Sequence, residues 1–178
     1  MFMQAIFVVL LAASSVPSPG GEGLHLGDRA PDFELSLATK DSVFEAPLRL
    51  STAVGKANII LAFYPADWSG GCTREMCTLR DSFSGLGELG ADVYGISGDY
   101  VYSHFEWAKH LSLPFALFSD HTNEVSRMYN SFNEQTGYNN RTVYVIDKTG
   151  RIAYIDPAYK AGGSESFSRL KEALRSLK

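Results

Sequence analysis

The chain has 178 residues, 45% of them hydrophobic and 12% aromatic, which is enough to bury the core of one domain and predicts a single domain rather than two. Its 16 lysines and arginines against 20 aspartates and glutamates give a net charge of −4 without a basic cluster, so nucleic acid is excluded as an expected partner. Two cysteines are too few for a disulfide scaffold and leave the cellular compartment open.

The first 25 residues are predicted to be a hydrophobic segment and linker that precede the domain. Residues 2–13 form an uncharged apolar run, shorter than the roughly 20 residues that span a bilayer, and small flexible residues follow. This pattern is typical of a secretory signal peptide, with a cleavage site at Ala13-x-Ser15, although no basic residue precedes the run. We therefore expect an exported protein, either periplasmic, secreted or tethered to a membrane through this segment. The alternative is a cytoplasmic protein with a domain that begins near Leu26.

Residues 27–63 are predicted to form a hairpin followed by a central strand. A turn and an alternating strand at 27–35, a polar segment to Ser42 and an apolar stretch to Leu50 indicate an N-terminal β-hairpin. Residues 57–63 are an apolar run without helical periodicity, as expected of a strand buried on both faces.

Both cysteines follow this strand. Pro65, Ser69 and a glycine pair predict a loop, whereas residues 72–81 lack glycine and proline and predict a helix. Cys72 then stands in the first turn of the helix, where unpaired backbone N–H groups and the helix dipole favour a thiolate. This makes Cys72 a candidate nucleophile.

Cys77 lies five residues after Cys72, which on a regular helix places it about 140° around the axis and about 8 to 9 Å away. A disulfide requires Cα atoms within about 7 Å of each other. If the two cysteines pair, the first turns of the helix must unwind, so we infer a helix that melts locally during a redox cycle.

The rest of the chain alternates strands and helices. The cysteine helix is expected to end between Gly85 and Gly90. The further predicted elements are a buried strand at 91–97, an amphipathic helix at 100–111, a strand at 115–118, a helix at about 124–132 capped from 120–123, a loop at 137–140, a tight hairpin of strands 141–147 and 151–156, and a helix at about 165–177. This order predicts an α/β protein with a thioredoxin-like fold, in which helices flank a central mixed β-sheet and the N-terminal hairpin is an extension.

A wider pattern connects the cysteines to residues elsewhere in the chain. The spacing is a proline, three residues, a threonine or serine, two residues and a cysteine, which here are Pro65, Ser69 and Cys72. Cys77 lies five residues after Cys72, and Arg141 begins a late strand. In these features, and from about residue 27 to the end, the sequence resembles a peroxiredoxin of the Q type, or bacterioferritin-comigratory protein, in the alkyl hydroperoxide reductase and thiol-specific antioxidant family. It departs from the family in having Ser69 where threonine is commoner and in the loop sequence Trp-Ser-Gly-Gly.

The resemblance implies a peroxiredoxin domain over residues 26–178 that acts as a thiol-dependent peroxidase on hydrogen peroxide and organic hydroperoxides. Cys72 would attack the peroxide and become a sulfenic acid. Cys77 would condense with it into an intramolecular disulfide, which thioredoxin or a related dithiol would reduce. Because such a disulfide needs no second chain, we expect a monomer, and a dimer stays open.

The resemblance also implies roles for the residues around the sulfur. The N–H groups of Gly71 and Cys72, the Ser69 hydroxyl and the Arg141 guanidinium would bind the peroxide and stabilise the thiolate. Pro65 would shield the sulfenic acid from further oxidation.

Other side chains near this pattern have weaker assignments. Arg80 is a candidate for holding Arg141 or a carboxylate in place, and Trp68 is either a wall of the pocket or a surface aromatic. The four histidines have no metal-ligand spacing with each other or with the cysteines, so no metal and no other cofactor is expected.

Two other interpretations stay open at this point. A thioredoxin-like protein disulfide oxidoreductase is the main alternative, although such proteins usually carry C-x-x-C rather than the C-x4-C found here. A copper-handling protein with the same fold would use the soft thiolates but would leave Pro65, Ser69 and Arg141 without a role. Peroxide consumption, reduction of insulin disulfides and bound metal distinguish the three.

Overall fold

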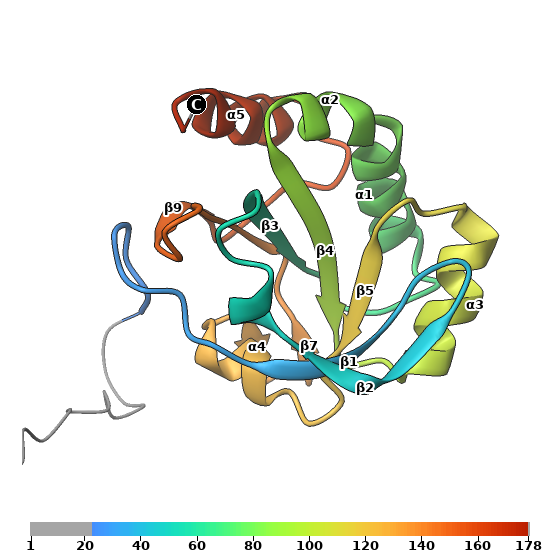
Figure 1. The fold of residues 1–178 in the computed structure, drawn as a ribbon. Helices are drawn as coiled ribbons and strands as arrows, with labels where there is room; N and C mark the ends of the chain where they lie inside the picture. The colour runs from blue at the N-terminus through green and yellow to red at the C-terminus, as the bar shows by residue number, and fades with distance from the viewer. Residues whose placement is uncertain (1–22, 178) are drawn as a thin grey trace, which may run out of the picture.

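A seven-stranded mixed sheet forms the centre of the molecule, as the computed structural model shows for residues 23–177 (Figure 1). The predicted signal peptide, with its apolar run and cleavage site, lies outside the described residues. The strands are β1 (Glu34–Ala38), β2 (Val43–Arg49), β3 (Asn58–Phe63), β4 (Ala91–Ser97), β5 (Ala116–Ser119), β8 (Thr142–Ile146) and β9 (Ile152–Asp156). The helices are α1 (Gly70–Asp81), α2 (Phe83–Glu88), α3 (Val101–Leu111), α4 (Glu124–Met128) and α5 (Ser164–Arg175), with a short 3-10 turn, η1, at Leu50–Thr52.

The strand order is β2-β1-β5-β4-β3-β8-β9. Strands β3, β4 and β5 are parallel, and β8 and β9 add an antiparallel hairpin on one side. On the other side, the predicted N-terminal hairpin of β1 and β2 joins the sheet through antiparallel pairing of β1 with β5. The α/β class, the mixed sheet and the hairpin extension are therefore confirmed.

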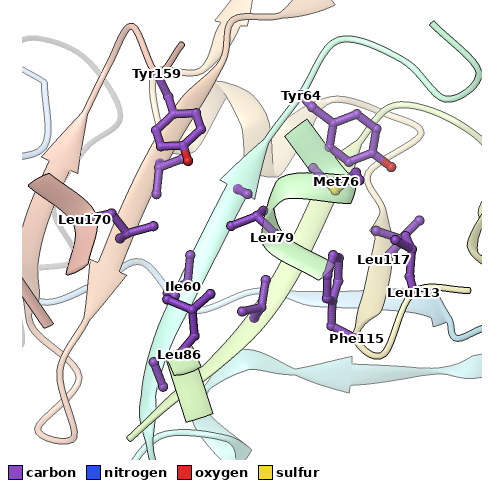
Figure 2. Close-up of a cluster of buried hydrophobic side chains, with 14 of the residues drawn as sticks. Ile60, Tyr64, Met76, Leu79, Leu86, Leu113, Phe115, Leu117, Tyr159 and Leu170 are labelled. Atoms are coloured by element: carbon purple, nitrogen blue, oxygen red, sulfur yellow. The ribbon is translucent and has the colours of Figure 1, made fainter. Parts of the chain in front are cut away.

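Strand β3 is buried on both faces because its side chains alternate between two apolar layers. Ile60 and Ala62 enter one layer, together with side chains from α1, α2, α3 and α5 (Figure 2). Ile59, Leu61 and Phe63 enter the other layer, which α4 and the segments beside β1 cover. This burial fixes the end of β3 firmly, and the loop that carries the cysteines starts there.

Helix α1 packs closely on the sheet through an apolar stripe. Met76 and Leu79 are fully buried in the first layer, near Tyr64 (Figure 2). On the neighbouring strand β4, a Cβ at Gly95 would lie 2.6 Å from Leu117 and 3.1 Å from the Tyr64 ring, so a glycine is needed for this close packing. The position of α1 is thereby determined by the core.

Three predicted elements differ in detail from the structure, although the helical segment that carries the cysteines does end between Gly85 and Gly90, at Glu88. The cysteine helix breaks at Ser82 into α1 and α2. Helix α4 ends at Met128 instead of near 132, and the buried Asp120 carboxylate caps it by accepting the N–H groups of Val125 and Ser126. The predicted loop at 137–140 contains β7 (Tyr138–Asn139), which pairs with β6 (Phe132–Asn133). Two-residue strands are too short for an alternating pattern to show in the sequence.

No helix among residues 23–177 is long and apolar enough to cross a membrane.

Candidate active site

Cys72 lies in the first turn of α1, directly after the loop that leaves β3. Its side chain is fully buried and its thiol is free. Ser69 is the N-cap of the helix, with φ −75° and ψ 140°, and its Oγ accepts a hydrogen bond from the Cys72 N–H at 3.4 Å. At this end of a helix, the remaining N–H groups and the dipole favour a negative charge on the sulfur.

Arg141 brings a positive charge to the same sulfur. It stands just before β8, and β8 runs antiparallel to β3 with Thr142 opposite Phe63, which places Arg141 at the end of β3 where the cysteine loop begins. Its Nη2 donates to Cys72 Sγ at 3.3 Å. A guanidinium in contact with a thiolate stabilises the charged form.

Glu75, which was not among the predicted site residues, holds the other side of the guanidinium. Arg141 Nη1 forms a hydrogen-bonded ion pair with Glu75 Oε2, and the Glu75 side chain is fully buried. Its Oε1 is buried without a hydrogen-bond partner among the described residues. Burial raises the pKa of Glu75 from 4.5 to about 7, although the Arg141 charge acts to lower it.

A signal for Glu75 exists in the sequence. It lies three residues after Cys72, so both side chains fall on one face of α1, together with Met76 and Leu79. A carboxylate in an apolar helix stripe requires a cation, because a buried charge without a partner is costly. The arginine of the late strand is that cation.

Gly71 leaves the space that Arg141 occupies. A Cβ at this position would lie 2.6 Å from Arg141 Nη2, whereas a Cβ at Gly70 would meet nothing within 4 Å. The glycine pair therefore contains one residue that allows the guanidinium to approach the sulfur and one that does not contact it.

Ser69 and Pro65 lie in the same loop as predicted, at different distances from the reacting sulfur. Ser69 is exposed; besides capping Cys72, its Oγ donates to the Ala66 carbonyl at 3.2 Å. Pro65 is half-buried at the start of the loop and lines a small cavity with Asp99, Tyr138 and other residues. The structure brings Cys72, Gly71, Ser69 and Arg141 together directly, whereas the cavity that Pro65 lines includes none of these four residues.

Cys77 lies on α1, one and a half turns after Cys72. It is half-buried against the first apolar layer, and its thiol is free. With both cysteines in one regular helix, the geometry separates their Cα atoms by more than the about 7 Å that a disulfide tolerates. A bond between them requires α1 to unwind.

The weaker candidates take other positions. Arg80 donates to Asp81 and to the Leu111 carbonyl instead of supporting Arg141. Trp68 is 55% exposed, with φ 61°, and its Nε1 donates to Ser103 at 3.3 Å, so it is a surface aromatic. Of the histidines, only His104 is buried among the described residues, and it contacts Asp67, a residue of the cysteine loop.

No group of three or more His, Cys, Asp or Glu side chains between residues 23 and 177 is placed to hold a metal ion. The arrangement instead offers a buried sulfur, a helix end and a guanidinium in contact, a combination that supports nucleophilic attack by a thiolate.

Comparison with known proteins identifies the family. Residues 26–155 match the AhpC/TSA family. The chain belongs to this family. Among curated relatives of this AhpC/TSA protein, chloroplastic peroxiredoxin Q of Oryza sativa subsp. japonica is 36% identical over 151 residues, covering 81% of this chain and 67% of the relative. The putative peroxiredoxin bcp of Coxiella burnetii is 36% identical over 146 residues, covering 79% of this chain and 93% of the relative.

Solved structures of AhpC/TSA relatives share the fold. Peroxidoxin BcpB of Mycobacterium tuberculosis has a TM-score of 0.74 and 27% identity, and the match covers 87% of this chain and 99% of that one. A mutant of PrxQ from Xylella fastidiosa has a TM-score of 0.76 at 21% identity, covering 89% and 100%. The fold is thus the thioredoxin-like fold of peroxiredoxins.

Proposed function

We propose that this AhpC/TSA protein, a thiol-dependent peroxidase, uses Cys72 as its nucleophile. The observation that carries the proposal is the contact of 3.3 Å between Arg141 Nη2 and Cys72 Sγ in the first turn of α1. A cation and a helix end on one buried sulfur favour the thiolate, the form of cysteine that attacks peroxides.

In the first step, the Cys72 thiolate attacks one oxygen of the peroxide and a sulfur–oxygen bond forms as the oxygen–oxygen bond breaks. The leaving oxygen departs as hydroxide or alkoxide and takes a proton to become water or alcohol. Sulfur is oxidised by two electrons to a sulfenic acid, and the peroxide is reduced by two. The Arg141 guanidinium and the Gly71 N–H are the proposed donors to the charge on the oxygens. The Cys72 N–H and the Ser69 hydroxyl, also proposed for this set, bond to Ser69 Oγ and to the Ala66 carbonyl in the resting structure and must release these partners to bind the peroxide.

In the second step, the Cys77 sulfur attacks the Cys72 sulfenic acid, water leaves, and a disulfide forms. Both residues belong to α1, so its first turns unwind during this step. The Gly70-Gly71 pair at the start of the helix lowers the cost of unwinding, because glycine is a poor helix former.

An external dithiol then reduces the disulfide by thiol exchange, and thioredoxin or a related protein is the proposed reductant. Hydrogen peroxide and organic hydroperoxides are the proposed substrates. All the residues named belong to one chain, so a monomer suffices for the cycle.

We also propose that residues 1–25 direct export of the domain formed by residues 26–178. The support is the apolar run of residues 2–13 and the cleavage motif after it. Fractionation of cells that express the full chain tests this. Export predicts a shortened protein outside the cytoplasm, or a protein of full length in the membrane fraction if the segment is a tether, and a cytoplasmic protein of full length refutes it.

Product analysis by mass spectrometry tests the cycle. The reduced parent, treated with one equivalent of hydrogen peroxide, is expected to form the Cys72–Cys77 disulfide, and Cys77→Ser is expected to retain a sulfenic or sulfinic Cys72. The Cys72→Ser variant is expected to show neither product. Equal, slow oxidation of all three proteins would refute the peroxidase cycle, and reduction of insulin disulfides without peroxide consumption would establish the oxidoreductase alternative.

A further inference from the structure

Asp67, in the loop between β3 and α1, is anchored through every polar group that it has. Its carboxylate, fully buried, accepts hydrogen bonds from Tyr64 Oη at 2.8 Å and Ser103 Oγ at 2.8 Å, and it lies 2.9 Å from His104 Nδ1. Its backbone N–H donates to Asp99 Oδ2 at 2.9 Å. The centre of the loop is thus attached to α3 and to the loop that precedes α3.

His104, on α3, is the residue around which this cluster is built. Its side chain is fully buried, with Nδ1 facing the Asp67 carboxylate and Nε2 lying 3.1 Å from the Phe118 carbonyl. A carbonyl only accepts hydrogen bonds, so Nε2 carries a proton. Nδ1 faces both the Asp67 carboxylate, at 2.9 Å, and the Tyr64 hydroxyl, at 3.3 Å. The ring therefore joins the loop, α3 and β5 through polar contacts at both of its nitrogens.

The cluster reaches the reacting cysteine in two further hydrogen bonds. The Asp67 carbonyl accepts the Ser69 N–H at 2.8 Å, and Ser69 Oγ accepts the Cys72 N–H at 3.4 Å. A shift of Asp67 would move the N-cap of α1, and with it the turn that holds Cys72 against Arg141. The hydrogen bond to the sulfur itself comes from Arg141, which lies outside the cluster.

The two sides of Ser69 differ in how they are held. Upstream, Asp67 is fixed by its side chain and its backbone, whereas downstream Gly70 and Gly71 carry no side chain that could hold the turn. The unwinding that Cys77 requires can therefore begin at the glycines while the loop with Pro65 and Ser69 stays in place.

We propose that His104, acting through Asp67, is a positioning residue that keeps the first turn of α1 formed around Cys72. The proposal rests on the proposed function, since the turn matters for the reaction with peroxide. Loss of the pair is expected to loosen the turn, slow the attack of Cys72 on peroxide, and leave the subsequent disulfide step as fast as before.

A double-mutant cycle of His104→Gln, Asp67→Asn and the double variant tests this. The matched control is Glu106→Gln, an exposed carboxylate on the same helix α3. Two quantities are measured at a temperature where each protein is folded: hydrogen exchange of the amides of residues 70–76, and the rate constant of reduced Cys72 with hydrogen peroxide. Both single variants are expected to exchange faster and to react about ten- to a hundredfold more slowly, because small misplacements of reacting groups have effects of that size.

The double variant is expected to lose no more than either single variant, since each breaks the same pair. The control keeps the parent values. An additive loss, or parent values in folded His104→Gln, would overturn the proposal, because a residue that only supports stability leaves the rate of the folded protein unchanged.

Ser103→Ala serves if the pair variants do not fold. It removes one donor to Asp67, together with the acceptor of the Trp68 Nε1–H, and leaves the pair with His104 intact. A smaller change of about two- to threefold in the same two quantities is expected, and parent values would overturn the proposal. If the parent does not react with peroxide through Cys72, the proposed function fails. Hydrogen exchange then still decides whether His104 and Asp67 hold the turn, because that readout needs no peroxide.

Discussion

Replacing Glu75 by glutamine is predicted to remove a large part of the pH dependence of stability. The Glu75 carboxyl is fully buried beside Arg141, and burial raises its pKa from 4.5 to about 7 against the effect of the Arg141 charge. Between these two pH values, the folded protein holds a proton that the unfolded chain has released. The proton therefore contributes stability that is fully present below pH 4.5 and is lost as the pH rises to about 7.

The size of the effect follows from the two pKa values. A difference of one in pKa corresponds to 1.36 kcal/mol, so the interval from 4.5 to about 7 corresponds to about 3 kcal/mol. Glutamine has nearly the same shape and no titrating group. The free energy of unfolding of the parent, minus that of Glu75→Gln, is thus predicted to fall by about 3 kcal/mol over this interval.

Urea unfolding of the reduced proteins, followed by tryptophan fluorescence at several pH values between 4.5 and 7, measures this difference. Glu88→Gln, which changes an exposed carboxylate on α2, is the control and is expected to follow the parent at every pH. If the free energy of unfolding of Glu75→Gln depends on pH in the same way as that of the parent, the Glu75 carboxyl has the same pKa in the folded and unfolded states. The argument that burial raises this pKa is then refuted.

Three substitutions test the geometry of the site and of the core beneath it. Gly71→Ala is predicted to displace the Arg141 guanidinium, because Nη2 would lie 2.6 Å from the new Cβ, and to slow the reaction with peroxide about tenfold. The control Gly70→Ala, with open space around its Cβ, keeps the parent rate. Equal rates for the two variants in a stopped-flow comparison would contradict this. Arg141→Lys is predicted to lower the rate of Cys72 with peroxide at least about tenfold, because one ammonium cannot contact both the sulfur and Glu75; a parent rate would show that charge alone suffices. Leu79→Ala, at a fully buried position, is predicted to lower the free energy of unfolding by about 2 to 5 kcal/mol in urea titrations. A loss below about 1 kcal/mol would mean that α1 packs less tightly than described.

The parts of the fold that depend on local pattern could be predicted from the sequence. The run at 57–63 reads as a doubly buried strand because both of its faces are apolar, and β3 is buried at every position. The helix after Cys72 follows from the absence of glycine and proline, whereas the glycine pair, which was predicted to belong to the loop, forms the first turn of α1. The short β6 and β7 were missed because two residues are too few for an alternating pattern, although the two strands lie close together in the sequence.

The composition of the site was harder to predict because it depends on contacts between distant elements. Arg141 reaches Cys72 only because β8 pairs antiparallel with β3, and the resemblance to a family suggested it where local pattern did not. Glu75 and His104 were missed because each reads as an ordinary helix residue until its burial is known. Polar residues on the apolar stripe of a helix are the signal that would have identified both.

The reaction of the reduced protein with one equivalent of hydrogen peroxide, followed by stopped-flow fluorescence, tests the central claim most directly. The parent and Cys77→Ser are predicted to react at the same rate, faster than free cysteine by orders of magnitude, because the thiolate of Cys72 carries the first step in both. Cys72→Ser is predicted to lose this phase entirely. A fast phase that survives in Cys72→Ser, or a parent that reacts no faster than free cysteine at the same pH, would contradict the assignment of Cys72 as the nucleophile.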